Sequence, residues 1–111
     1  MFMSNIKEID APELAQWVTE ADQKVRVLDV RQMNEIAGGT VPRAEAMPLH
    51  TLPIKFSDLS REEKLVLICR SGARSAQACM FLQQQGFENV YNLRGGMIGW
   101  VQSGFAPVAL A

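Results

Sequence analysis

A chain of 111 residues predicts a single domain over residues 1–111. Apolar residues make up 48% and charged residues 21%, which excludes intrinsic disorder, and a formal charge of −1 gives no basic excess for nucleic acid or an anionic membrane. Two cysteines and one histidine are too few for a disulfide framework or an all-Cys/His zinc site, and nothing predicts a metal or organic cofactor. With no signal peptide or apolar run long enough to span a membrane, we expect a cytoplasmic protein.

The first half of the chain predicts a helix, a strand and a loop-rich segment. Apolar residues recur at helical spacing over residues 11–21, and residues 25–30 are typical of a strand that ends in polar residues. The loop-rich stretch that follows contains a pair of glycines and three prolines. Within it we expect a short strand near residues 46–49 and a helical turn before Ser60.

A continuous apolar run, residues 65–69, is typical of a central strand that is covered on both faces. A helix is predicted over residues 74–85, with Ala76, Cys79 and Met80 on its packed face. Packing is therefore the expected role of Cys79.

Strand and helix signals continue to alternate after this helix. Gly86 can take the left-handed conformation at the helix end, residues 90–93 predict another buried strand, and Gly95-Gly96 opens a short helix carrying Trp100. This alternation favours a parallel sheet with helices on both faces. Ligands bind such sheets beyond the carboxyl ends of the strands, and Cys69 lies at such an end.

The loop after Cys69 has features that favour an ionised thiol. Successive backbone N–H groups can form a cup for an anion, and the following helix adds the positive end of its dipole. Arg70 and Arg74 contribute two positive charges, and Gly72 permits the tight turn. Comparable settings lower the pKa of a cysteine. The alternative is a small core cysteine before an ordinary turn, but two arginines beside a buried strand end are costly without an anion.

Three motifs resemble those of the rhodanese family, the sulfurtransferases that carry sulfur as a cysteine persulfide. The active-site loop is Cys69-Arg70-Ser71-Gly72-Ala73-Arg74-Ser75, the early motif is Leu28-Asp29-Val30-Arg31 with Glu35, and the closing motif is Leu93-Arg94-Gly95-Gly96-Met97-Ile98-Gly99-Trp100. The resemblance spans residues 5–105 with the motifs in order. It implies a rhodanese-like α/β fold with a central, mainly parallel sheet of about five strands and helices on both faces.

One segment departs from the family pattern. Where the family usually has Gly-His-Ile-Pro-Gly-Ala, this chain has Gly39-Thr40-Val41-Pro42-Arg43-Ala44. The histidine and the second glycine are missing, and Arg43 adds a cation. Glu45 stands where the family tends to be apolar.

The spacing within the loop separates two chemistries. Four residues lie between Cys69 and Arg74, whereas cysteine phosphatases and related arsenate reductases have five, which widens the cup for a tetrahedral anion. The shorter loop suits a single sulfur atom on the cysteine. No Cys–His dyad is evident, and His50 is expected to be structural or exposed.

The resemblance and the chemistry together imply double displacement at Cys69. Cys69 attacks the outer sulfur of a donor such as thiosulfate, and a thiophilic acceptor (cyanide, a thiol or a protein cysteine) then removes that sulfur. Amides from Arg70 through Ser75, including those of Ser71, Gly72 and Ala73, stabilise the persulfide. Arg74 is expected to bind the sulfonate end of thiosulfate, with Arg70 guiding anions at the rim.

Two supporting roles follow from the early motif. By resemblance, Asp29 supports the active loop through polar contacts. Arg31 and Glu35, four residues apart, are expected to pair within a helical turn, a contact worth only tenths of a kcal/mol.

The hypothesis is therefore a single-domain thiosulfate or persulfide sulfurtransferase acting through Cys69, with a protein among its candidate acceptors. A non-catalytic sulfur carrier or interaction module is one alternative. A cysteine-dependent phosphatase or arsenate reductase is the other, and it rests only on the general likeness of a thiolate beside an arginine.

Overall fold

Five parallel strands form the central sheet of the computed structural model, which describes residues 6–20 and 24–111. The strands are β1 (Lys7–Ile9), β2 (Val25–Asp29), β3 (Ala44–Ala46), β4 (Lys64–Ile68) and β5 (Val90–Leu93). Their order is β1-β5-β4-β2-β3, and every neighbouring pair is parallel. The predicted sheet of about five strands is confirmed.

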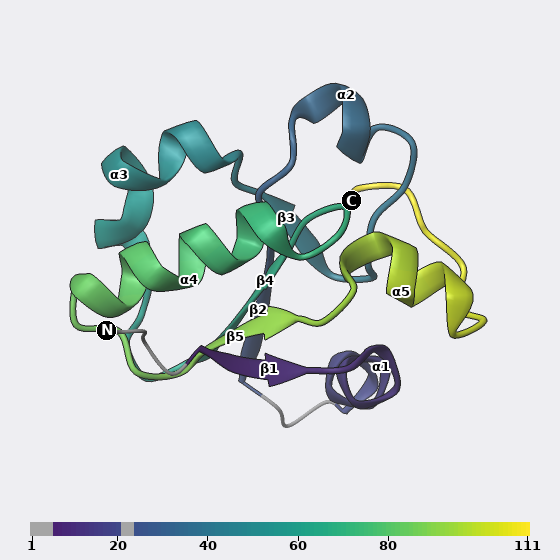
Figure 1. Cartoon of the computed structure of the whole chain (residues 1–111), viewed down its shortest axis with the longest axis horizontal. Helices are drawn as coiled ribbons and strands as arrows, with labels where there is room; N and C mark the ends of the chain where they lie inside the picture. Colours follow the sequence, from purple (N-terminus) through teal and green to yellow (C-terminus); the bar gives the residue numbers. More distant parts are fainter. Residues whose placement is uncertain (1–5, 21–23) are drawn as a thin grey trace.

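Helices cover both faces of this sheet (Figure 1). They are α1 (Ala11–Thr19), α2 (Met33–Ile36), α3 (Leu52–Lys55), α4 (Ala73–Gln84) and α5 (Gly96–Gln102), with short 3-10 turns at Leu49–Thr51 and Phe56–Asp58. Residues of α1 and α5 pack in one apolar cluster, and residues of α3 and α4 pack in the other. Within the described ranges, the helices are all too short or too polar to cross a membrane.

Alternation along β4 explains why the sequence shows an unbroken apolar run there. Leu65 and Leu67 face the cluster of α3 and α4, whereas Val66 and Ile68 face the cluster of α1 and α5. Because both faces of the strand are buried, neither set can be polar.

The N-terminal helix is shorter than the sequence predicts. Asp10 accepts a hydrogen bond from the backbone N–H of Glu13 at 2.9 Å and caps α1, while Leu14 and Val18 are buried. The helix ends at Thr19 because Glu20 has extended backbone angles, and residue 21 of the expected range lies outside the described residues.

The helix after the Cys69 loop, α4, ends one residue before the predicted Gln85, is followed by the predicted left-handed Gly86, and differs from prediction in its packed face. The backbone N–H of Phe87 donates to the carbonyl of Leu82 at 3.0 Å, closing the helix through Gly86 with a φ of 93°. Cys79 is buried, but Met80 is 36% exposed. The prediction for Met80 is wrong because the face against the sheet is formed by Ser75, Ala78, Cys79 and Leu82.

Two short strands at the sheet edges differ from expectation. No strand was predicted at β1, where only Ile9 is buried. The strand expected near residues 46–49 is instead β3, which aligns Ala44 with Val27. Glu45 on this edge strand pairs with Arg26 at 2.7 Å, which accounts for a charge where the family tends to be apolar.

The atypical segment of residues 39–44 lacks the histidine and the second glycine of the family pattern, and contacts made by Thr40 and Arg43 hold it in place. The Thr40 hydroxyl donates to Asp29 at 2.7 Å, and the Thr40 backbone forms an antiparallel bridge with Val108. Arg43 has a left-handed φ of 70°, a conformation that glycine adopts without strain, and its guanidinium donates to the carbonyls of Val18 and Val25 at 3.3 and 3.4 Å.

Candidate active site

The thiol of Cys69 lies at the carboxyl end of the middle strand, β4. Its side chain is 1% exposed and belongs to the apolar cluster beneath α4. The chain then turns through Gly72, whose φ of 107° allows α4 to begin at Ala73. Cys69 therefore lies between the strand end and the first turn of a 12-residue helix.

Several hydrogen-bond donors converge on the sulfur of Cys69. The backbone N–H of Gly72 donates to Sγ at 3.0 Å, and the Ser75 hydroxyl lies 3.3 Å from Sγ. Burial alone raises the pKa of Cys69, but the Ser75 hydroxyl and the backbone amides of Ser75, Gly72 and Ser71 outweigh it. The net result is a pKa below the ordinary cysteine value.

A buried asparagine on β5 supports the two residues whose polar groups approach the Cys69 sulfur, Gly72 and Ser75. Asn92 is 4% exposed; its Oδ1 accepts from the Ser75 hydroxyl, and its Nδ2 donates to the carbonyl of Gly72 at 3.2 Å. The Ser75 hydroxyl has one proton, which it can donate either to Asn92 Oδ1 or to Cys69 Sγ. Sequence reasoning missed Asn92, although a polar residue inside an apolar strand was the available signal.

The closing glycine motif fixes the active loop from a second side. Backbone N–H groups of Met97 and Ile98 donate to the carbonyls of Cys69 and Arg70 at 2.8 and 3.1 Å. A Cβ on Gly96 would lie 2.5 Å from the Cys69 carbonyl oxygen, so only glycine permits this approach. These bonds from α5 fix the backbone of the loop, and the Gly72 amide that follows donates to the Cys69 sulfur.

Arg74 is bound by an acidic side chain. Its two terminal nitrogens donate to the two carboxylate oxygens of Glu35 at 2.7 and 2.9 Å, joining α4 to α2. These hydrogen bonds, with one from the Gln32 backbone, lower the pKa of Glu35 to about 2. The positive charge of Arg74 is therefore largely compensated by Glu35.

The expected pair between Arg31 and Glu35 is wrong. Arg31 precedes α2, so the two residues do not share a helical turn, and Arg31 instead binds Asp29 at 2.7 Å and the carbonyl of Gly39 at 2.7 Å. Asp29 is fully buried, and its hydrogen bonds go to Arg31 and Thr40 rather than to the active loop. Both residues thus fix the segment beside the site.

The sequence model of the rhodanese-like domain family matches residues 10–103 of this chain. The chain belongs to the rhodanese-like domain family. It is 43% identical to a protein named sulfurtransferase from Allochromatium vinosum over 94% of this chain and 96% of that protein. It is 32% identical to the thiosulfate sulfurtransferase GlpE of Shewanella oneidensis over 88% of this chain and 95% of that one.

The fold of this rhodanese-like domain is similar to that of solved relatives. The crystal structure of a rhodanese-related protein from Thermoplasma volcanium superimposes with a TM-score of 0.83 at 32% identity, covering 94% of this chain and 99% of that one. The family and the fold class predicted from the sequence motifs are confirmed.

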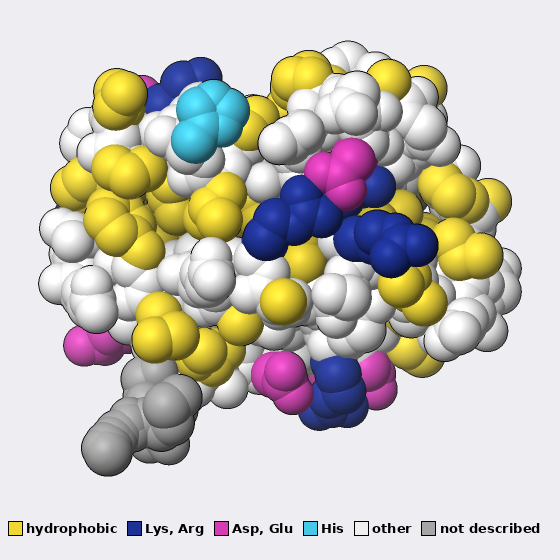
Figure 2. Space-filling view, turned by 45° about the horizontal axis from the view of Figure 1, so that its top comes forward, with side chains coloured by type: hydrophobic (Ala, Val, Ile, Leu, Met, Phe, Trp, Pro, Cys, Tyr) yellow, Lys and Arg dark blue, Asp and Glu magenta, His cyan; other side chains and the backbone are white. Residues whose placement is uncertain are grey.

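The remaining loop residues of this rhodanese-like domain point outward. Arg70 is exposed and has no ion pair within residues 6–20 and 24–111, and the side chains of Ser71 and Ala73 are also exposed. His50 is exposed as expected, yet it lines a hollow of about 260 Å³ together with Arg74. Basic and acidic side chains gather at the centre of one face, with apolar side chains around them (Figure 2).

Proposed function

We propose that this protein is a sulfurtransferase that moves sulfane sulfur from thiosulfate or a persulfide donor to a thiophilic acceptor through a persulfide on Cys69. The observation that carries the proposal is the set of donors at Sγ: the Gly72 amide at 3.0 Å and the Ser75 hydroxyl at 3.3 Å. Donors that stabilise a thiolate also stabilise the persulfide anion that replaces it.

The two half-reactions need no added oxidant or reductant. The Cys69 thiolate attacks the outer sulfur of thiosulfate, a new S–S bond forms, and sulfite leaves with the electron pair of the broken bond. A thiophilic acceptor then attacks the terminal sulfur, and Cys69 leaves again as a thiolate. With cyanide as the acceptor, the product is thiocyanate.

We assign the anionic end of the donor to Arg70 rather than to Arg74. The Arg74 guanidinium is bound on two nitrogens by Glu35, whereas Arg70 is exposed and directly follows the nucleophile. Arg70→Ala is therefore expected to raise KM for thiosulfate more than it lowers kcat. Arg74 acts mainly by holding α2 against α4.

The test compares the wild-type protein with Cys69→Ser in a thiosulfate and cyanide assay. Thiocyanate should form only with the wild type, and mass spectrometry after thiosulfate treatment should find one added sulfur on Cys69. Equal activity in both proteins would remove Cys69 from the reaction. A stable persulfide that cyanide does not discharge would indicate a sulfur carrier, and turnover of a small phosphate ester would indicate a phosphatase.

A further inference from the structure

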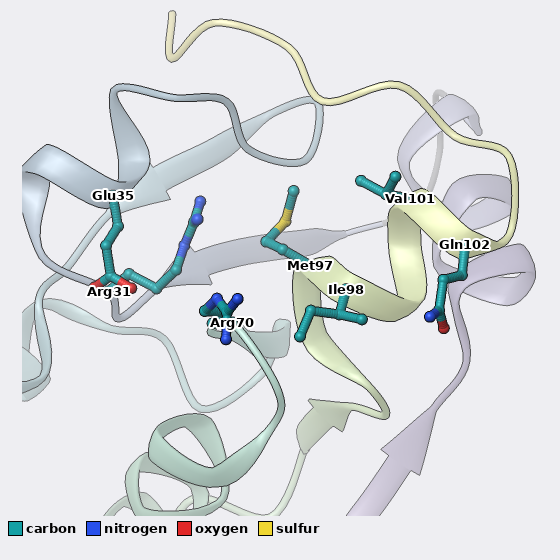
Figure 3. Close-up of a pocket in the computed structure, with 7 residues that line it drawn as sticks. All are labelled: Arg31, Glu35, Arg70, Met97, Ile98, Val101 and Gln102. Carbon is teal, nitrogen blue, oxygen red and sulfur yellow. The ribbon is translucent and has the colours of Figure 1, made fainter.

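A groove of about 460 Å³ opens beside the active loop, between α5 and the segment that holds Arg31 and Glu35 (Figure 3). Arg70 lies between these two sides, and Met97, Ile98 and Val101 form the apolar wall of the groove (Figure 3). A volume in this range accommodates an organic ligand or a peptide side chain with its neighbours. It is far larger than a small anion such as thiosulfate requires.

The wall of the groove is unusually apolar for an exposed surface. Ile98 and Val101 lie one helical turn apart on α5, and they are 39% and 52% exposed. Isolated exposed apolar residues are ordinary, but these two share one groove beside a nucleophile. A partner that covers them removes apolar surface from water.

Three charged side chains line the groove, and only one of them lacks an ion-pair partner among the described residues. Arg31 is paired with Asp29, and Glu35 is paired with Arg74. Arg70 has no acidic partner in the part of the chain that the structure describes, which leaves an uncompensated positive charge in the groove, at the residue that follows Cys69. An acidic group on a bound molecule complements that charge.

The groove has a fixed position relative to Cys69. The same helix that supplies the apolar wall donates backbone hydrogen bonds from Met97 and Ile98 to the carbonyls of Cys69 and Arg70. A molecule held against Ile98 and Val101 is therefore held at a set distance from the sulfur.

We propose that this groove binds the sulfur acceptor, and that the acceptor is a protein cysteine flanked by an apolar and an acidic side chain. The acidic side chain meets Arg70, and the apolar one covers Ile98 and Val101. Sites for small molecules enclose most of the ligand, whereas this groove is open along one side, as expected for a segment of a larger partner. This inference rests on the proposed sulfurtransferase function.

The transfer step balances without a co-reactant. The acceptor cysteine loses its proton to solvent, and its thiolate attacks the terminal sulfur of the Cys69 persulfide. The S–S bond at Cys69 breaks, Cys69 leaves as a thiolate, and the acceptor becomes the persulfide.

The experiment starts from the full-length protein carrying a persulfide on Cys69 and measures how fast different probes remove it. The probes are three peptides of equal length, centred on Leu-Cys-Glu, Ser-Cys-Glu or Leu-Cys-Lys, together with glutathione and cyanide. The Leu-Cys-Glu peptide should react about tenfold faster than the other two peptides and faster than glutathione. Similar rates for all the thiols, or a faster reaction with glutathione, would overturn the inference.

Variants of the protein sharpen this test. Val101→Glu should lower the Leu-Cys-Glu rate relative to the cyanide rate by about tenfold. Ile54→Glu is the matched control, because Ile54 is 81% exposed on α3 and does not line the groove. Arg70→Glu should reverse the preference from Leu-Cys-Glu to Leu-Cys-Lys.

Failure of the inference and failure of the proposed function give different results. Discharge by cyanide with no discrimination among the peptides, or equal effects of Val101→Glu and Ile54→Glu, contradicts only the acceptor site. Failure to form any persulfide on Cys69 contradicts the sulfurtransferase function, and the acceptor site falls with it.

Discussion

The two cysteines of this chain show that burial alone does not decide the state of a thiol. Cys69 is 1% exposed and Cys79 is 0% exposed, and both lie in the same apolar cluster. Burial raises the pKa of Cys79 to about 12, whereas the donors around Cys69 lower its pKa despite burial. Cys79 lies inside α4, where backbone amides are already bonded within the helix, while Cys69 meets free amides at the end of a strand.

The largest expected effect separates the two cysteines directly. Cys69→Ala should abolish thiocyanate formation, because the nucleophile is removed. Cys79→Ala should retain activity and lose about 1 kcal/mol of stability, since a small buried side chain is shortened. Steady-state assays and denaturant unfolding measure both quantities. Similar losses of activity in the two variants would remove the functional difference between the thiols.

The second prediction tests the support that α5 gives to Cys69. Gly96→Ala should lower activity by about a hundredfold, because a Cβ 2.5 Å from the Cys69 carbonyl displaces the loop. Gly104→Ala is the matched control: Gly104 also has a positive φ, of 91°, but nothing lies within 4 Å of its Cβ position. That variant should lose about 1–2 kcal/mol of stability with little change in activity. Equal activity losses would mean that backbone strain, not contact with the loop, matters.

The third prediction concerns the hydroxyl that approaches the sulfur. Removing it in Ser75→Ala should raise the pKa of Cys69, because a donor to the thiolate is lost. Alkylation of Cys69 by iodoacetamide, followed across a pH series, should slow several-fold near neutral pH and shift its midpoint upward. Ser103→Ala, at an exposed site after α5, is the control. An unshifted profile would assign the low pKa to the backbone amides alone.

The smallest effect lies away from the sulfur, at the pair of Glu35 and Arg74. The pKa of Glu35 is about 2 in the folded protein, below its ordinary 4.5, so the charged carboxylate stabilises the fold above pH 4.5. That contribution is lost as the pH falls from 4.5 towards 2. Glu35→Gln should flatten this part of the stability profile by up to about 1 kcal/mol, measured as the unfolding midpoint at each pH. An identical slope in both proteins would show that the pair adds nothing.

Local patterns made the elements around Cys69 predictable from the sequence. Each of these elements has a signal that lies within a few residues of sequence. The signals are the apolar run of β4, the glycine after the end of α4 and the Gly95-Gly96 pair. The strand β1 could not be predicted in this way, because three residues with one buried side chain leave no periodic signal.

The polar contacts of the site were harder to predict, because they join distant parts of the chain. Glu35 and Arg74 are 39 residues apart, and Asn92 reaches Ser75 across 17 residues. Local spacing instead favoured a pair between Arg31 and Glu35, which the start of α2 at Met33 prevents. The residues of the loop could be named from sequence, but their partners depend on the packing of α2, α4 and β5.

The most direct test is a titration of Cys69 in the Cys79→Ala background, where a single thiol remains. Thiolate formation is followed by its ultraviolet absorbance as the pH rises. The account predicts a midpoint clearly below the value of about 8.5 that is ordinary for a free cysteine. A midpoint at or above that value would contradict the claim that the donors around this sulfur overcome its burial.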